Sequence, residues 1–187
     1  MNALTARNAL DALNLGIGST LLVTGAAGAV GANTVVLAHE QGVKVIAVAS
    51  QGDETFLRDL GAEYFAVRGS SVNERILSAL PAGVDAIIDT ANLQSGVLPS
   101  LRGSGSIVVL RPWADPVSDG THIIHVNVRG RLGDQATIRQ LVRLAADGKL
   151  PLRVAGIYPA SQVVAAHQRF DAGGLRGRLV LDFEHVL

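Results

Sequence analysis

Residues 20–50 carry the feature that most constrains what this chain can fold into. A strand-like run, TLLVT, leads into a loop that contains Gly25, Gly28 and Gly31. A helix-like stretch follows the loop, and a second apolar run occupies residues 43–49. A strand, a glycine-rich turn, a helix and a second strand, in this order, form the unit that binds the pyrophosphate of a dinucleotide. The alternative is a tight strand–helix turn without a ligand, and the order of the elements favours the dinucleotide.

The three glycines are each needed for a physical reason. Gly25 and Gly28 allow a sharp turn and bring bare backbone close to phosphate, and Gly31 lets the helix pack tightly against the sheet. We expect the main-chain N–H groups of Ala29, Val30 and Gly31 to point at the pyrophosphate, because the helix dipole favours an anion there. The Gly-x-x-Gly-x-x-Gly spacing differs from the commoner Gly-x-Gly-x-x-Gly motif.

Strand-like and helix-like runs alternate through the first 130 residues. The sequence predicts strands at 20–25, 43–50, 63–67, 84–90, 105–111 and 122–128, and helices at 5–13, 29–41, 53–60, 72–80 and 94–101. Nearly continuous apolar strands that alternate with helices indicate a parallel sheet covered on both faces. Because crossovers are right-handed, the expected α/β fold is a Rossmann-type, doubly wound, six-stranded parallel sheet with helices on both faces.

The pattern changes after the sixth predicted strand. Residues 134–147 have the clearest helical periodicity, with Asp134 as the expected N-cap. The apolar positions that follow i, i+3, i+4 and i+7 are Ile138, Leu141, Val142 and Ala145. A strand at 152–158, a helix that begins at Ser161 and a strand at 177–183 come too late for the main sheet. We expect them to form a C-terminal strand–helix–strand extension.

Composition excludes several classes of function. The 16 basic and 16 acidic residues cancel, so no net charge favours nucleic acid or anionic lipid as a partner. The chain has no cysteine, which excludes disulfides and thiolate metal sites. No segment reads as a signal peptide, and no apolar run reaches the ~18 residues that a membrane helix needs. We therefore expect a soluble cytoplasmic protein that binds neither nucleic acid nor membrane.

The residues after the second and third strands indicate which dinucleotide binds. Sites that prefer NADH usually place an acidic side chain at the tip of the second strand, to hold the ribose 2′-hydroxyl. Here that position is Ser50, followed by Gln51, and Arg68 follows the third strand. A small neutral residue and a nearby cation favour the 2′-phosphate of NADPH, whereas Asp53 opposes it. The sequence predicts NADPH, with NADH as the alternative.

Other catalytic arrangements find little support. The glycine loop is also similar to that of extended short-chain dehydrogenases and sugar epimerases, which need a tyrosine four residues before a lysine to act as acid–base. The only lysines are Lys44 and Lys149, and neither has a tyrosine at that spacing. His122 and His125 lie three apart on a predicted strand and face opposite ways, which does not suit one metal ion. We identify no catalytic residue and no metal site.

Several segments together resemble the nucleotide-binding half of the medium-chain dehydrogenase/reductase superfamily, in its zinc-free, quinone oxidoreductase-like branch. These segments are LTARNALDAL, VTGAAGAVGANTVVLA, LGAEYFAV, VDAIIDTA, GSIVVL and QVVAAHQRFDAGGLRGRLVLDF. The resemblance implies an NADPH-dependent reductase of quinones, enones or related carbonyl compounds. It divides the chain into a linking helix (1–18), a dinucleotide-binding domain (19–150) and a segment (151–187) that returns to an N-terminal catalytic domain. We expect that catalytic domain to be absent from this chain.

The chain differs from members of this superfamily at positions that bind the cofactor. Asp53 stands where NADPH-using relatives often have a lysine, and Arg68 where they often have a tyrosine. By resemblance, the loop at Thr90 and Ala91 and the loop at Arg111 border the nicotinamide. The predicted cofactor-binding residues are Thr24, Gly25, Ala27, Gly28, Ala29, Val30, Gly31, Ser50, Gln51, Arg68, Thr90, Ala91, Leu110 and Arg111.

Two hypotheses for function remain open. The chain is the cofactor-binding domain of an NADPH-dependent oxidoreductase with a small-molecule substrate, or it is a module that binds a dinucleotide without turnover. We also expect a homodimer, because the predicted sixth strand, 122–128, is an edge of the sheet that is rich in Ile and Val.

Overall fold

The computed structural model describes residues 1–116 and 120–184. The chain divides into two compact units, Met1–Leu150 and Pro151–Leu187, and each is described by itself. Among these described residues, no helix is long and apolar enough to cross a membrane.

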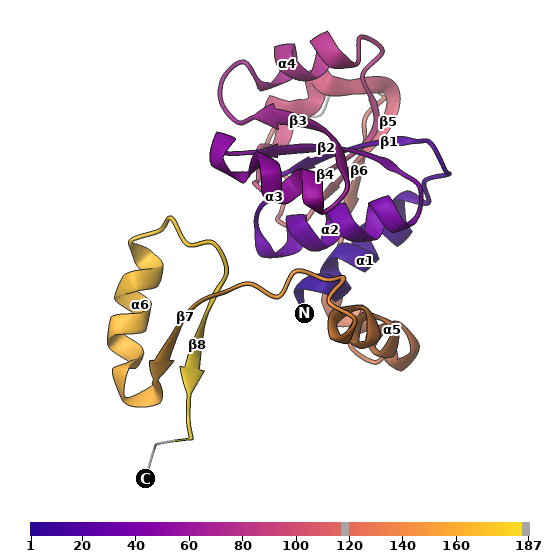
Figure 1. The fold of residues 1–187 in the computed structure, drawn as a ribbon. Coiled ribbons are helices and arrows are strands. Elements are labelled where there is room, and N and C mark those ends of the chain that lie inside the picture. The colour runs from indigo at the N-terminus through magenta and orange to yellow at the C-terminus, as the bar shows by residue number, and fades with distance from the viewer. Residues whose placement is uncertain (117–119, 185–187) are drawn as a thin grey trace. The chain divides into compact units, whose positions relative to one another are not determined.

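The first unit is built on a six-stranded, fully parallel sheet (Figure 1). Its strands are β1 (Thr20–Thr24), β2 (Lys44–Ala49), β3 (Ala62–Val67), β4 (Val84–Asp89), β5 (Leu101–Val109) and β6 (His122–His125). Their order across the sheet is β3-β2-β1-β4-β5-β6, and every neighbouring pair is parallel. The chain runs outward in one direction from β1 and then in the other from β4, so the topological switch point lies between these two strands. The predicted doubly wound fold is confirmed.

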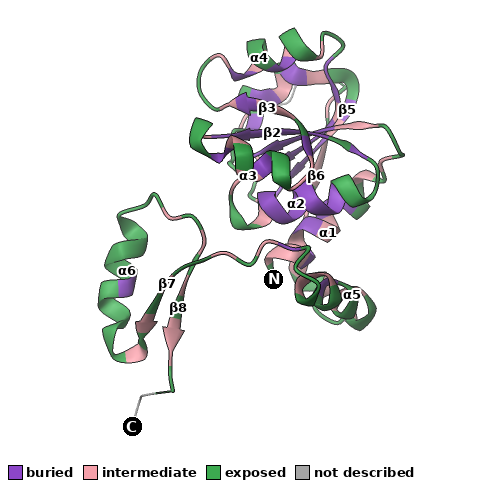
Figure 2. Cartoon of the chain, viewed as in Figure 1, coloured by how far each residue is buried: buried purple, intermediate pink, exposed green. Residues whose placement is uncertain are grey.

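Helices cover both faces of this sheet. They are α1 (Asn2–Leu13), α2 (Ala29–Glu40), α3 (Glu54–Asp59), α4 (Val72–Ala79) and α5 (Gln135–Ala146), together with short 3-10 turns η1 (Gln51–Asp53), η2 (Gln94–Ser100) and η3 (Val128–Arg131). On one face, α1, α2, α3 and α5 pack over Leu21 and Val23 of β1. On the other face, α4 and η2 pack over Leu22. Consecutive strand residues thus enter separate cores, as the two-residue period of a strand requires. Figure 2 shows the buried residues gathered in the sheet and α2.

Several predicted elements differ from the structure in type or in bounds; α1, for example, begins at Asn2 rather than at residue 5. The sequence predicts a short helix at 94–101, but Gln94–Ser100 form the 3-10 turn η2, which contains Pro99, a residue without a main-chain N–H to donate. Strand β5 begins at Leu101 rather than 105, and its register with β4 shifts before Ser106. Strand β6 ends at His125 rather than 128, because the chain turns into η3.

The amphipathic helix α5 is present, although one expected core residue is not buried. Leu141 is buried and Ile138 and Ala145 pack partly against the core, but Val142 is 62% exposed. The apolar stripe is therefore narrower than the pattern predicts. Asp134 caps the helix, since its carboxylate accepts a hydrogen bond from the main-chain N–H of Thr137 at 3.0 Å.

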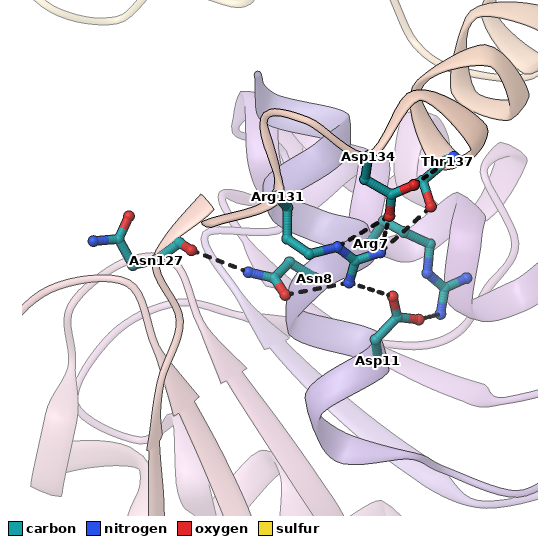
Figure 3. Close-up of polar contacts among 7 residues, drawn as sticks. All are labelled: Arg7, Asn8, Asp11, Asn127, Arg131, Asp134 and Thr137. Atoms are coloured by element: carbon teal, nitrogen blue, oxygen red, sulfur yellow. Dashed lines mark hydrogen bonds and ion pairs between the residues drawn. The ribbon is translucent and has the colours of Figure 1, made fainter. Parts of the chain in front are cut away.

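A cluster of charged side chains joins the start of α5 to α1 (Figure 3). The guanidinium of Arg131 forms ion pairs with Asp134 at 2.7 Å and with Asp11 of α1 at 2.9 Å. Arg7 forms a second ion pair with Asp11 at 2.6 Å. Arg131 thus links the N-cap of one helix to the side of the other.

The Asp134 carboxylate predicts a pH dependence of stability. Hydrogen bonds from the Thr137 main chain and from Arg131 lower the pKa of Asp134 from 3.8 to about 2. A lowered folded-state pKa stabilises the fold above the unfolded-state value, and this stabilisation is lost as the pH falls through the folded-state value. In Asp134→Asn, which keeps a capping oxygen, we expect a melting temperature below wild type at neutral pH. The difference, followed by circular dichroism, should shrink between about pH 4 and about pH 2; a constant difference over that range would contradict the assignment.

The second unit is a small strand–helix–strand layer. It contains β7 (Val154–Pro159), the 3-10 turn η4 (Ala160–Gln162), α6 (Val163–Asp171) and β8 (Arg178–Asp182). The two strands pair with each other in parallel, with Ile157 opposite Val180. The expected C-terminal strand–helix–strand extension is therefore present. Ile157 and Val180 are 67% and 40% exposed, so one sheet face of this unit remains largely uncovered.

Candidate functional site

The predicted cofactor residues fall along one edge of the sheet. Because all six strands are parallel, their carboxyl ends lie at the same edge, where ligands of doubly wound folds bind. In the order of the strands, Arg68 follows β3, Ser50 follows β2, Gly25 follows β1, Thr90 follows β4 and Leu110 follows β5. The structure thus arranges these five predicted positions in a row, with the glycine loop at its centre.

The turn between β1 and α2 leaves several N–H groups without helical partners. Gly25 has a φ of +58°, in the left-handed region that favours glycine. The N–H of Gly28 donates to the Gly25 carbonyl at 2.9 Å, and the N–H of Ala32 donates to the Gly28 carbonyl at 2.9 Å. The N–H groups of the first helical turn have no carbonyl to bind within their own helix. Gly28 and Ala29 are exposed, so this end of α2 is open to an anion.

Two of the glycines also allow close packing inside the site. A Cβ on Gly31 would lie 2.4 Å from the Gly25 carbonyl oxygen and 2.7 Å from the Ala26 Cα, both of them main-chain atoms. A Cβ on Gly25 would lie 2.8 Å from the hydroxyl oxygen of Thr90. By contrast, a Cβ on Gly28 would contact only the Gly25 carbonyl, at 3.1 Å. Gly31 therefore holds the helix against the turn, whereas Gly28 faces outward.

A buried carboxylate joins the ends of β1 and β4. Asp89 is 2% exposed and accepts hydrogen bonds from the Thr24 hydroxyl at 2.5 Å and from the Gln94 main-chain N–H at 2.8 Å. The Thr24 hydroxyl in turn accepts from the Ala91 N–H at 3.1 Å, and the Thr90 hydroxyl donates to the Thr24 carbonyl at 2.7 Å. The side chain of Thr24 is thus used inside the protein, where it links the ends of β1 and β4 at the switch point.

The tips of β2 and β3 bring Ser50 and Arg68 together. Ala49 pairs with Val67, and the N–H of Arg68 donates to the Ala49 carbonyl at 2.8 Å, so the residues that follow the two strands are neighbours. Arg68 is exposed. Asp53, which argues against a 2′-phosphate, is buried in the turn η1 with 4% exposure, so it presents little carboxylate to this edge.

The loops after β4 and β5 are joined by a residue that the sequence did not indicate. Gln94 is buried, and its side-chain NH₂ donates to the Pro112 carbonyl at 3.1 Å while its side-chain oxygen accepts from the Ala114 N–H at 2.9 Å. A single glutamine in a loop has no recognisable spacing, so no pattern could have identified it. Trp113, in the same loop, packs partly against the α4-side core.

Asp85 lies on β4 four residues before Asp89, at the opposite end of the strand. Its carboxylate accepts from the Thr20 main-chain N–H and hydroxyl, both at 2.8 Å, and pairs with Arg102 at 2.5 Å. Burial raises the pKa of Asp85, but the hydrogen bonds from Thr20 and the charge of Arg102 outweigh it and hold the pKa below its ordinary value. The residue thus stays ionised as a structural link away from the carboxyl edge.

The two histidines of β6 are not placed as a metal site. His122 and His125 lie at the two ends of β6, and both are exposed. Within residues 1–116 and 120–184, no group of three or more His, Cys, Asp or Glu side chains is placed to hold a metal ion.

Comparison with known proteins identifies the family. A family model described as "Zinc-binding dehydrogenase" matches residues 60–181. Alcohol dehydrogenase 1 of Caenorhabditis elegans is 25% identical to this chain over an alignment of 191 residues. The alignment covers 96% of this chain and 54% of that protein. The chain therefore spans about half the length of this relative.

Solved structures share the fold of this chain, and this chain again covers only part of their length. A probable oxidoreductase from Mycobacterium abscessus is 28% identical with a TM-score of 0.80, over 96% of this chain and 59% of that chain. The quinone oxidoreductase from Coxiella burnetii is 26% identical with a TM-score of 0.79, over 98% of this chain and 59% of that chain. The chain thus belongs to the zinc-binding dehydrogenase family, within the medium-chain dehydrogenase/reductase superfamily, and corresponds to the nucleotide-binding half of these nicotinamide-dinucleotide-dependent oxidoreductases.

Proposed function

We propose that this chain binds NADPH and serves as the cofactor-binding half of a zinc-independent reductase of quinones, enones or related carbonyl compounds. The observation that carries the proposal is the open N-terminus of α2 behind the Gly25 turn, at the switch point of the sheet. The residues fit the cofactor there, because Gly28 and Ala29 are exposed and first-turn N–H groups lack helical partners.

Each part of the row at the carboxyl edge has a proposed task. The N–H groups of Ala29, Val30 and Gly31 hold the pyrophosphate. Ser50 and Arg68 hold the 2′-phosphate of the adenosine ribose. The loops that begin at Thr90 and Leu110 position the nicotinamide. When bound, the dinucleotide supplies the hydride, and these residues bind it and orient it.

The preference for NADPH is tested by removing the positive charge of Arg68. In the wild-type chain we expect NADPH to bind more tightly than NADH. Arg68→Ala should reduce that ratio about ten- to a hundredfold, since a charge-assisted hydrogen bond contributes about 1.5–3 kcal/mol, and it should leave the affinity for NADH unchanged. Arg139→Ala, on the exposed surface of α5, is the control. Fluorescence titration of both cofactors measures the ratio; equal affinities in the wild type would refute the preference.

A module that binds the dinucleotide without turnover is the second candidate. The observation that favours it is that the predicted site residues bind and orient the dinucleotide, and none of them is assigned as a general acid or base. Steady-state oxidation of NADPH by the purified chain with a simple quinone separates the two proposals. Turnover supports a reductase, and binding without turnover supports the module.

We also propose that the chain forms a homodimer through β6. This strand is the last of the sheet, so its outer edge has no strand partner among the residues that the structure describes, and it carries Ile123 and Ile124. We expect sedimentation at micromolar concentration to give a dimer, with amide hydrogen exchange in residues 122–125 slowing as the concentration rises. A monomer across this range would end the proposal.

Finally, we propose that the two units correspond to parts of different domains in the longer relatives. Residues 19–150, with the linking helix 1–18, form the cofactor domain. Residues 151–187 are the segment that packs with a catalytic domain in such proteins.

A further inference from the structure

We infer that Gln94 is a positioning residue that fixes the two loops beside the nicotinamide and joins them to the glycine turn. This inference rests on the proposed function, since it concerns how the same edge of the sheet holds the far half of the cofactor. By holding these loops, Gln94 determines how much the nicotinamide half contributes to the affinity for the whole dinucleotide.

The side chain of Gln94 bridges two loops that are distant in the sequence. Its NH₂ group donates to the Pro112 carbonyl at 3.1 Å and to the Asn92 side-chain oxygen at 3.2 Å. Its oxygen accepts from the Ala114 N–H at 2.9 Å. One amide, 8% exposed, thus satisfies main-chain groups of the loop after β5 from within the loop after β4.

The backbone of this loop is held in an unfavourable conformation. Asn92 and Gln94 have φ values of +58° and +51°, and they are two of the three non-glycine residues with positive φ in residues 1–116 and 120–184. Such conformations persist where the surroundings enforce them, and they concentrate at sites that hold ligands. Here the enforcing contacts are those of the Gln94 side chain and of its main-chain N–H with Asp89.

The same hydrogen bonds reach the glycine turn. Asp89 accepts from the Gln94 N–H and also from the Thr24 hydroxyl, and Thr24 immediately precedes Gly25. Ser95 extends the linkage, because its N–H donates to the Asp115 carboxylate at 3.0 Å. Polar networks with buried, hydrogen-bonded central members, here Asp89 and Gln94, rigidify the groups that they join. The pyrophosphate turn and both nicotinamide-side loops are therefore connected through Asp89 and Gln94.

The exposed parts of these loops are what the network positions. Ala91 and Asn92 on one side and Arg111 and Pro112 on the other are exposed, although the residues that anchor them are buried. Exposed loop residues that are held by buried side chains are expected where backbone groups must be presented to a ligand in one geometry.

The experiment compares two ligands that differ only in the nicotinamide half. NADPH and 2′-phospho-ADP-ribose are titrated by calorimetry into the wild type, into Gln94→Met and into the control Gln140→Met, which lies on the exposed surface of α5. Methionine has nearly the shape of glutamine and the same conformational preferences, so the change removes only the amide contacts. We expect the affinity ratio of NADPH to 2′-phospho-ADP-ribose to fall about tenfold in Gln94→Met, as the loss of one or two net hydrogen bonds implies. It should be unchanged in Gln140→Met.

Three outcomes overturn the inference, and they are distinguishable. If the wild type binds neither ligand, the proposed function fails and the inference with it. If the wild type binds both ligands equally, the loops do not hold the nicotinamide, although the proposed function stands. If Gln94→Met retains the wild-type ratio, Gln94 is only structural. If Gln94→Met does not fold, Gln94→Glu is used instead; it keeps the acceptor for Ala114 and loses the donor to Pro112, and the ratio should again fall.

Discussion

Replacing Gly28 with valine is expected to weaken the binding of either nicotinamide dinucleotide by about a hundredfold or more, which corresponds to about 2.7 kcal/mol. Gly28 is exposed at the end of α2 that the pyrophosphate would approach, so a branched side chain there occupies the space of the ligand. Its φ of −75° and ψ of 172° suit any residue, and an added Cβ would contact only the Gly25 carbonyl, at 3.1 Å. The change should therefore remove binding and leave the fold intact.

This prediction is checked by fluorescence titration of Gly28→Val together with its circular dichroism spectrum and melting temperature. Gly130→Val is the matched control, because a Cβ at Gly130, in the turn η3, would have no atom within 4 Å. The control should bind like the wild type. Retained affinity in a folded Gly28→Val chain would mean that the phosphates lie elsewhere.

Replacing Gly31 with alanine is expected to destabilise the fold by about 2 kcal/mol. A Cβ at this position would lie 2.4 Å from the Gly25 carbonyl oxygen, so the helix and the turn would have to separate. Forcing extra atoms into a tightly packed site costs about 1–3 kcal/mol and occasionally more, and contact with main-chain atoms places this case at the upper end. The better helix propensity of alanine returns only about 1 kcal/mol.

Urea denaturation of Gly31→Ala gives the free energy of unfolding. Gly130→Ala serves again as the control and should unfold like the wild type, because nothing lies within 4 Å of its added methyl group. If Gly31→Ala were as stable as the wild type, the close approach of α2 to the turn would be contradicted. Substitutions at these two glycines, three residues apart, should thus have different effects. Gly28→Val should abolish binding of the dinucleotide, and Gly31→Ala should lower the free energy of unfolding.

Much of this arrangement could be predicted because it follows from local patterns. The alternation of apolar strands with helices fixes a parallel sheet, and a parallel sheet places every strand's carboxyl end at one edge. For that reason Ser50 and Arg68, which are far from the glycine turn in the sequence, could be assigned to one site, whereas Thr90 was assigned to it by resemblance. The roles of Gly25 and Gly31 also follow from the strand–turn–helix order alone, and their φ value and close contacts agree.

What could not be predicted depends on contacts between loops. Gln94 has no periodicity or spacing that marks it, and its importance comes only from where the chain places Pro112 and Ala114. The burial of Asp53 is similar, because the sequence shows an acid near the phosphate site but not that η1 turns it inward. The early start of β5 at Leu101 was missed because its glycine- and serine-rich sequence has no strand pattern.

The most direct test of the account is an NMR titration of the ¹⁵N-labelled chain with NADPH. The central claim is that the main-chain amides at the start of α2 bind the cofactor's pyrophosphate. We expect the amide signals of Gly28, Ala29, Val30 and Gly31 to shift most, with smaller shifts at Ser50 and Arg68. Shifts confined to other surfaces, or no shifts at saturating NADPH, would contradict it.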